Sequence, residues 1–359
     1  MSTVKRVPVR SLASGAVLHI HTHTFKGTVP GAGRAYIQSS MHGSEVQGNA
    51  VIAELLEVFA RTPPRGDVVL VPNANPFPIN QKAGEYTPGR FDPTTGENWN
   101  RTYWLPTLGD VRRPRWPQLK QQAWSRLASQ LRTRLQGDLP FGRRLALTLQ
   151  SLAVGADYVI DLHCANVSAR HIYTPEHCAD AARYFQIPLI LSIPATFDGA
   201  MDESVSAPWW TLWQALEAEA YPDLPPPEDL PRGYTLELGG QEVISREDAR
   251  RDAAGILNFL REHGVVGGRA KKPEPAYLCR LEDYKVIHSR HAGHADYTAA
   301  MGVGVKKGAQ LAQTLQFGPS PSWLPTLAEE DCIPVLHHSS AIIHTGSELL
   351  KVFTNVRKV

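Results

Sequence analysis

Polar side chains that can bind a metal follow two apolar runs of this sequence. Residues 42–45 read His-Gly-Ser-Glu and come after the run 34–40, and Asp-Leu-His closes the run 157–163. Two histidines and one glutamate form a ligand set for a catalytic zinc that keeps one position open for water. The pattern therefore predicts a metal-dependent hydrolase if three side chains converge, namely those of His42, Glu45 and His163.

The spacing of His42 and Glu45 is weak support on its own, because a histidine three residues before a glutamate often occurs by chance. Gly43 adds weight, since glycine permits close backbone approach and unusual dihedral angles. The pair also lies between an expected strand and an expected helix, where α/β folds place ligands. The alternative is structural, with His42 a satisfied turn histidine and His163 a capped core histidine. Spacing alone leaves both interpretations open.

The elements that must position these residues follow an α/β pattern. Residues 17–25 alternate apolar and polar side chains, which predicts a half-buried strand, and residues 34–40 predict a second one. Residues 47–61 carry apolar side chains at a helical period, and two prolines end the helix. Residues 67–71 form a short β-branched run that predicts a buried strand. This strand–helix–strand succession is typical of a parallel or mixed sheet.

The rest of the first 266 residues continues this scheme. Residues 73–101 are rich in Pro, Gly, Asn and Thr and predict a long functional loop. Ser245 is a candidate helix N-cap, because Asp248 follows it at the acidic third position. We expect helices over 117–136, 143–154 and 245–263, and strands over 157–162, 188–193 and 234–238.

The C-terminal part of the chain has a different sequence pattern from the first 266 residues. Residues 267–275 are rich in Gly, Lys and Pro and predict a linker between a first domain, 1–266, and a small all-β domain, 276–359. The last part has short strand-like runs with Gly and Pro turns. Within it, we expect strand and turn over 299–311 and β-structure over 340–356.

Size and composition are those of an ordinary globular protein. The chain has 359 residues, of which 42% are hydrophobic and 20% charged, and its formal net charge is +2. Such a balance argues against nucleic acid or a membrane surface as partner, since both usually require a large basic excess. The four cysteines form no CxxC pair and indicate reduced, mostly buried thiols. We find no secretory signal and no transmembrane span, so we expect cytoplasmic residence.

Five short motifs together resemble those of the succinylglutamate desuccinylase/aspartoacylase family, a branch of the zinc carboxypeptidase-like hydrolases. The resemblance covers most of residues 16–264, and the Gly-rich β tail also resembles the domain appended in that family. It implies an α/β fold: a zinc carboxypeptidase-like core whose mixed central sheet is flanked by helices, plus a small C-terminal all-β domain. In chain order the motifs are His42-Gly43-Ser44-Glu45, Asn75-Pro76, Asn100-Arg101, Asp161-Leu162-His163 and Glu237-Leu238-Gly239-Gly240.

The resemblance also implies roles for single residues. One zinc ion per chain would be bound by His42, Glu45 and His163. Glu237 would be the general base, and Arg90 would lie near the scissile carbonyl oxygen as a catalytic and substrate-binding group. Asn100 and Arg101 would hold a substrate carboxylate. Apart from the resemblance, the position of Asp161 two residues before His163 predicts that its carboxylate orients a metal ligand.

Two features depart from the family pattern. The loop 86–98 is longer than in the best-known members and has a different sequence. Because this loop carries Arg90, the departure concerns the role assigned to Arg90. Trp99 precedes the Asn-Arg pair, in the run Glu-Asn-Trp-Asn-Arg, where well-known members have Asp-Leu or Asp-Met. These departures concern the substrate clamp rather than the zinc ligands.

The sequence therefore predicts a zinc-dependent amidohydrolase that acts on carbon–nitrogen bonds other than peptide bonds. Its expected partner is a small carboxylate-bearing substrate, an N-acylated amino acid or a related acyl-amide. One alternative is a zinc metallocarboxypeptidase or cell-wall-type peptidase, which would share the metal site. Another is a metal-stabilised binding protein without catalysis. The acyl group, the amine and a homo-oligomeric state stay open, as does the role of the insertion 104–142.

Other clusters of aromatic or titratable residues have simpler interpretations. Three tryptophans near residue 210 are more typical of a core face than of a substrate box. Two histidine triplets, one alternating in an early strand and one in the β region, favour solvated or turn positions. These triplets are His19, His21 and His23, and His288, His291 and His294.

Overall fold

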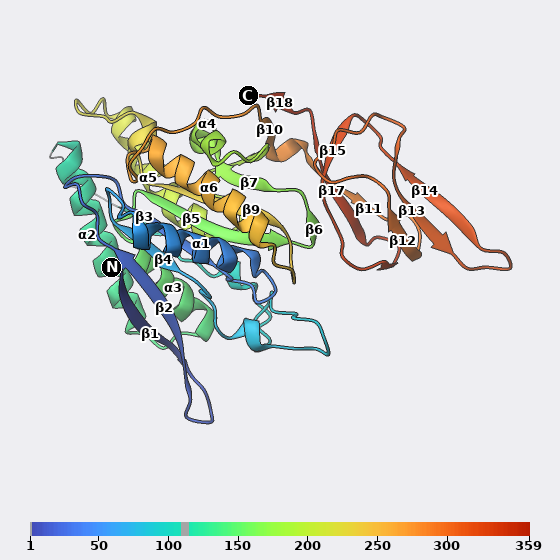
Figure 1. Cartoon of the computed structure of the whole chain (residues 1–359), viewed down its shortest axis with the longest axis horizontal. Coiled ribbons are helices and arrows are strands. Elements are labelled where there is room, and N and C mark those ends of the chain that lie inside the picture. Colours follow the sequence, from blue (N-terminus) through green and yellow to red (C-terminus); the bar gives the residue numbers. More distant parts are fainter. Residues whose placement is uncertain (1, 109–114) are drawn as a thin grey trace.

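A ten-stranded mixed sheet forms the centre of the molecule (Figure 1). The computed structural model describes residues 2–108 and 115–359. Four neighbouring strands, β4, β3, β5 and β9, run parallel, and β7, which pairs antiparallel with β9, reverses the direction. In spatial order the strands are β1 (Thr3–Ser11), β2 (Val17–Phe25), β4 (Val68–Val71), β3 (Ala35–Ser39), β5 (Tyr158–Ala165), β9 (Arg232–Gly240), β7 (His171–Pro175), β8 (Leu189–Ile193), β10 (Tyr277–Arg280) and β18 (Arg357–Lys358).

Helices cover both faces of this sheet (Figure 1). On one face α1 (Gln47–Arg61) and α6 (Arg246–Glu262) pack against each other and, with the short α4 (Ala179–Ala182), enclose an apolar core. On the other face lie α3 (Phe141–Ala153) and α5 (Met201–Ala218), while α2 (Trp116–Leu135) packs on α3 and with the tryptophans of α5. This arrangement confirms the expected mixed α/β fold.

The central strand β5 shows how the sheet sorts its side chains. Ile160 and Leu162 enter the core under α1 and α6, whereas Val159 enters the core under α3. Because side chains alternate along a strand, Asp161 and His163 share the face of Val159. Both are buried, so two polar side chains stand on a strand whose other residues are apolar or half-buried.

Two four-stranded antiparallel sheets make up most of the C-terminal part, at the right of Figure 1. The short β6, which follows β5, joins the first of them, and β10 and β18 extend the central sheet instead. The division of the chain into domains therefore stays a prediction. The sheets are ordered β11 (Tyr284–His288), β17 (Glu348–Thr354), β15 (Cys332–His337) and β6 (Val167–Ser168), and β14 (Ser322–Leu327), β13 (Gln310–Gln316), β12 (Gly293–Tyr297) and β16 (Ile342–Ile343).

Most expected elements occur with bounds shifted by at most a few residues, and α1 spans the residues predicted for it. Ser245 caps α6, since its hydroxyl accepts a hydrogen bond from the backbone N–H of Asp248. The expected strand within 299–311 is wrong for most of that range, because β13 begins only at Gln310. Several elements had no sequence prediction, among them β1, β6, β7, α4 and α5.

The remaining segments are turns and loops. The long loop 73–101 contains two single 3-10 turns, η1 (Pro78–Asn80) and η2 (Trp99–Arg101). The others are η3 (Glu176–Cys178), η4 (Arg183–Phe185), η5 (Pro227–Asp229) and η6 (Leu281–Asp283).

All four cysteines are free and buried, as expected. None of the helices in the described ranges combines the length and the apolar composition needed to cross a membrane.

Candidate active site

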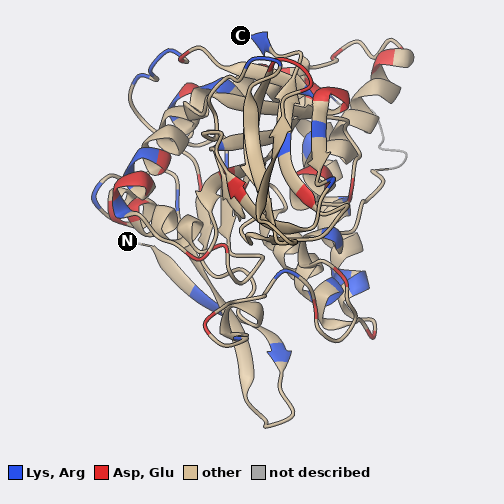
Figure 2. Cartoon of the chain, turned by 90° about the vertical axis from the view of Figure 1, so that its right-hand side faces the viewer, with Lys and Arg blue, Asp and Glu red and all other residues tan. Residues whose placement is uncertain are grey.

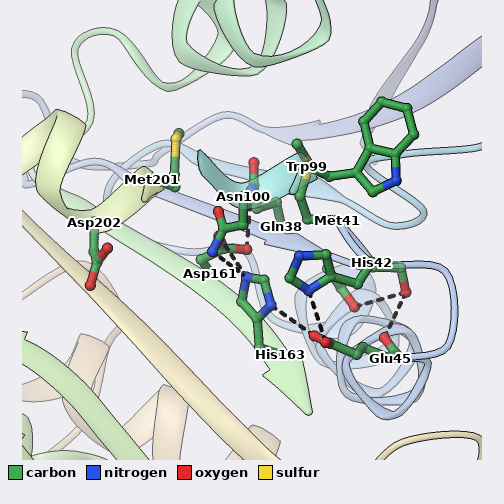
Figure 3. Close-up of polar contacts among 12 residues, drawn as sticks. Gln38, Met41, His42, Glu45, Trp99, Asn100, Asp161, His163, Met201 and Asp202 are labelled. Carbon is green, nitrogen blue, oxygen red and sulfur yellow. Dashed lines mark hydrogen bonds and ion pairs between the residues drawn. The ribbon is translucent and has the colours of Figure 1, made fainter. Parts of the chain in front are cut away.

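The three candidate metal ligands lie together at the carboxyl ends of β3 and β5 (Figure 3). One ligand atom from each of His42, Glu45 and His163 lies within 4.8 Å of the other two. Glu45 Oε1 is 2.8 Å from His42 Nδ1, and Glu45 Oε2 is 2.8 Å from His163 Nδ1. All three side chains are buried. The convergence on which the sequence interpretation depended is therefore present.

Local backbone constraints hold the turn between β3 and α1 that carries His42 and Glu45. A Cβ atom on Gly43 would lie 2.4 Å from the carbonyl oxygen of Pro78, so close approach is what requires glycine here. Ser40 adopts a left-handed conformation with φ of 60°, which is uncommon for a residue other than glycine. Its hydroxyl donates to the carbonyl oxygen of Glu45 at 2.9 Å. The tight turn thus directs both ligands to one side.

The outward-facing nitrogens of both histidines have partners of their own. His42 Nε2 is 2.8 Å from Asn98 Oδ1, and His163 Nε2 is 2.9 Å from Asp161 Oδ2. Partners at Nε2 fix the ring orientation and leave Nδ1 for the centre, as is usual for metal-binding histidines. The contact of Asp161 agrees with its expected orienting role. Asn98 had no sequence-based role, although its position two residues before Asn100 in the family motif was a usable signal.

Charge within the cluster favours an ionised glutamate. Burial alone would raise the pKa of Glu45, but the charges and hydrogen bonds of His42 and His163 outweigh it and hold this pKa well below its usual range. For His163 burial is likewise outweighed, by Asp161 and Glu45, and its pKa is well above the ordinary value. A buried carboxylate between two imidazoles matches the donors that divalent transition metals prefer.

Glu237 stands beside this cluster on β9. In the parallel register of β5 and β9 it is the partner of His163. Its Oε2 atom is buried and has no hydrogen-bond partner in the described part of the chain. Burial, followed by the charge of Glu45, raises its pKa to about 7. A carboxyl group with such a pKa next to a metal-type cluster suits proton transfer near neutral pH.

The two candidate arginines lie at the rim of the same region. Arg90 Nη1 is 3.3 Å from Glu45 Oε1, and the Arg90 side chain is 48% exposed. Burial raises the pKa of Tyr173, and the charge of Glu237 raises it further. The charges of Arg101 and Arg90 lower the same pKa. One tyrosine therefore lies within electrostatic reach of the candidate base and of both arginines.

Arg101 has an internal partner that the sequence did not indicate. Its Nη2 atom is 2.5 Å from Asp198 Oδ2, and its Nη1 donates to the carbonyl oxygen of Asn100 at 2.9 Å. Asp198 lies in the loop before α5, where the backbone N–H groups of residues 197–199 donate to the buried Glu203 carboxylate. The guanidinium is thus held by a loop about one hundred residues away in the chain. Asn100 is buried, with Nδ2 3.3 Å from His163 Nε2.

Charge elsewhere on the molecule is mixed. Figure 2 shows basic and acidic residues interspersed along the same helices and loops. The tryptophans and histidines to which the sequence assigned no chemical role lie outside the candidate site. Trp209 and Trp213 pack in a core with α2, and His21 on β2 is exposed.

Comparisons with known proteins identify similar chains and folds. The sequence model of the succinylglutamate desuccinylase/aspartoacylase catalytic domain matches residues 32–139 and 141–263. A crystal structure of a protein of that family from Shewanella amazonensis SB2B is similar at 39% identity, with a TM-score of 0.94 over 99% of this chain and 100% of the other. A second, from Shewanella frigidimarina NCIMB 400, has 38% identity and a TM-score of 0.93 over 99% and 98% of the two chains.

More distant structures share the fold. The ectoine utilization protein EutE of Ruegeria pomeroyi, in a product-bound structure, is 18% identical, with a TM-score of 0.67 over 98% of this chain and 95% of the other. At that identity the likeness concerns the fold alone. A search of curated proteins gave no match.

Proposed function

Because this chain belongs to the succinylglutamate desuccinylase/aspartoacylase family, whose members are amidohydrolase deacylases, we propose that it is a zinc-dependent deacylase. Its substrate would be a small N-acylated amino acid or a related acyl-amide, cleaved at a carbon–nitrogen bond that is not a peptide bond. A carboxypeptidase-like core is part of the same proposal. The observation that carries it is the buried cluster of His42, Glu45 and His163 with Glu237 on the neighbouring strand.

The donor set fits zinc. Two imidazole nitrogens and one carboxylate, each braced from outside, are a known catalytic combination that leaves a position for water. Zinc, when bound, would lower the pKa of a water molecule to about 7 and polarise the scissile carbonyl group. Copper, nickel and other divalent metals share these donors, so zinc itself is part of the proposal.

The chain's own residues would supply the remaining steps. Glu237 accepts a proton from the attacking water and passes it to the leaving nitrogen as the carbon–nitrogen bond breaks. Arg90 donates N–H groups to the carbonyl oxygen, where negative charge develops. Arg101, held by Asp198, and the amide of Asn100 bind a substrate carboxylate. The acyl group leaves as a carboxylate and the other product is a free amine.

Metal analysis followed by a substrate panel tests this function. The purified protein should contain about one zinc per chain and should hydrolyse N-acyl amino acids in preference to short peptides with a free C-terminus. A peptidase would give the reverse preference with the same metal content. Zinc binding without hydrolysis of either class would support the metal-stabilised binding protein, and the absence of bound metal would contradict the proposal as a whole.

The pH dependence of kcat/KM is expected to have an acid limb that follows Glu237. The base works only when deprotonated, so activity falls as pH falls through its pKa. Burial raises this pKa to about 7. A nearby divalent cation favours the carboxylate, so the midpoint should lie at or below about 7. Rates measured between about pH 5 and 9 check this. An acid limb whose midpoint lies clearly above about pH 7 would contradict the prediction.

Replacing Arg101 by alanine is expected to raise KM for the carboxylate substrate by roughly 10- to 100-fold, since hydrogen bonds to charged groups contribute about 1.5–3 kcal/mol. The kcat should change much less. Arg143→Ala is the control, because Arg143 forms an exposed ion pair with Glu97 of the same loop region. Steady-state kinetics of the two variants check the difference. An unchanged KM in Arg101→Ala would remove Arg101 from the clamp.

A further inference from the structure

A fully buried glutamine, Gln38, lies behind the candidate metal site (Figure 3). It is on β3, and in the parallel register of β3 and β5 its partner is Asp161. An amide side chain at such a position costs free energy unless its donors and acceptor are all satisfied. The question is therefore which partners satisfy the amide of Gln38.

One N–H of the Gln38 amide leads to the metal side. Nε2 donates to Asp161 Oδ1 at 3.0 Å, and the other oxygen of Asp161 is 2.9 Å from His163 Nε2. Asp161 is itself fully buried, so its carboxylate has no bulk water to orient it. The hydrogen bond from Gln38 fixes the carboxylate plane and, through it, the ring of His163.

The other N–H leads to the substrate side. Gln38 Nε2 also donates to the Tyr103 hydroxyl at 3.1 Å. Tyr103 is buried and comes two residues after Arg101, in the segment that also carries Asn98 and Asn100. This contact therefore ties the loop that would hold the substrate carboxylate to the strand beside His163.

The rest of the amide is satisfied as well. The hydroxyl of the buried Tyr36 donates to Gln38 Oε1 at 2.9 Å, and the Tyr103 hydroxyl donates to Met41 Sδ at 3.6 Å. Gln38 thus has two donors and one acceptor in use, so every hydrogen-bonding group of its amide has a partner. Such an arrangement gives one defined geometry, because any shift of Gln38 breaks hydrogen bonds on both sides at once.

We propose that Gln38 is a positioning residue that couples the metal ligand His163 to the substrate loop 98–103. The inference rests on the proposed function, since it assumes that His163 binds a metal and that Arg101 and Asn100 bind substrate. Gln38 touches neither metal nor substrate. It acts on the metal side through Asp161 and on the substrate side through Tyr103.

Three variants separate the two branches. Gln38→Met has nearly the same volume and removes both donors, and Gln38→Asn keeps an amide that is too short to reach both partners. Tyr103→Phe removes the partner on the substrate branch alone. Gln150→Met is the matched control, because Gln150 is a buried glutamine whose amide braces the backbone of Trp104 instead. Zinc affinity is measured for each by competition with a chromophoric chelator, after thermal unfolding of the zinc-free protein has verified the fold.

Both Gln38 variants are expected to bind zinc about 10-fold or more weakly, at the lower end of the range for residues that support metal ligands. Tyr103→Phe should keep the wild-type zinc affinity within about two-fold and should raise KM for the best substrate of the panel, and Gln150→Met should change neither quantity. Unchanged zinc affinity in a folded Gln38 variant would overturn the proposal. Equal weakening in Tyr103→Phe or Gln150→Met would also overturn it, by indicating general loosening. Failure of the wild-type protein to bind zinc would instead contradict the proposed function.

Discussion

Glu237→Gln is expected to lower kcat by roughly 100- to 10,000-fold, the usual contribution of a general acid–base group. Glutamine has almost the same shape but cannot accept a proton from water. KM and zinc content should stay near their wild-type values, because no contact of Glu237 with the three candidate ligands is needed to hold them: Glu45 already joins the two histidines. The loss should therefore appear in kcat alone, as measured by steady-state kinetics and metal analysis of the same preparation.

Asp252→Asn is the matched control for this substitution. Asp252 is a buried carboxylate, as the Oε2 atom of Glu237 is, but it lies on α6, where it forms an ion pair with Arg170 at 2.8 Å. Its amide variant should lose some stability and keep kcat within about two-fold, as expected for a site outside the reaction. Glu237→Gln should not be less stable than the wild type near pH 7, since it removes a carboxylate whose burial is uncompensated. Full activity in Glu237→Gln would remove the residue from the mechanism.

The sequence predicted those elements of the fold whose pattern is local. The apolar period of α1, the prolines after it and the Ser245 cap of α6 each act within a few residues, and the structure contains them where they were expected. Helix α5 had no prediction because Pro208 lies inside it, which usually argues against a helix. Strand β1 is an edge strand with mostly exposed side chains, so no apolar run marks it.

In the candidate site, too, contacts between residues close in the sequence could be predicted and contacts between distant residues could not. His42 and Glu45 are three residues apart, and a turn suffices to bring them together, so spacing indicated them. Glu45 and His163 are 118 residues apart, and their contact depends on the parallel pairing of β3 with β5. The ordered motifs of a family replaced that missing information for the ligands and for Glu237.

Pairs of residues with no motif could not be found from sequence. Asp198 holds Arg101 only because a loop before α5 folds back over η2. Nothing in the sequence of either segment indicates that the two lie in contact. The same is true of Gln38, which a strand pattern would treat as one more buried position. Its hydrogen bonds to Asp161 and Tyr103 exist because the register of two strands and the course of a loop coincide there. Such contacts are set by tertiary structure.

Removal of the metal is expected to abolish activity while the fold persists. The apolar cores on the two faces of the central sheet hold the fold independently of the metal site. Zinc-free protein should therefore unfold cooperatively at a lower temperature. The stability gained on adding zinc at a thousand times its Kd should be about 4 kcal/mol. Chelation followed by thermal unfolding and by activity assays with and without added zinc measures both effects.

Glu45→Gln tests the same point without a chelator. The neutral amide cannot replace the carboxylate as an ionised ligand, so zinc content and activity should both fall to background. Glu54→Gln is the control: Glu54 lies on α1, the helix that follows the turn with Glu45, and pairs with Arg246 on the surface, so this variant should keep one zinc per chain. Activity that survives both exhaustive chelation and Glu45→Gln would mean that the buried cluster is structural. The reaction would then have to be explained by Glu237 as the base and the two arginines alone.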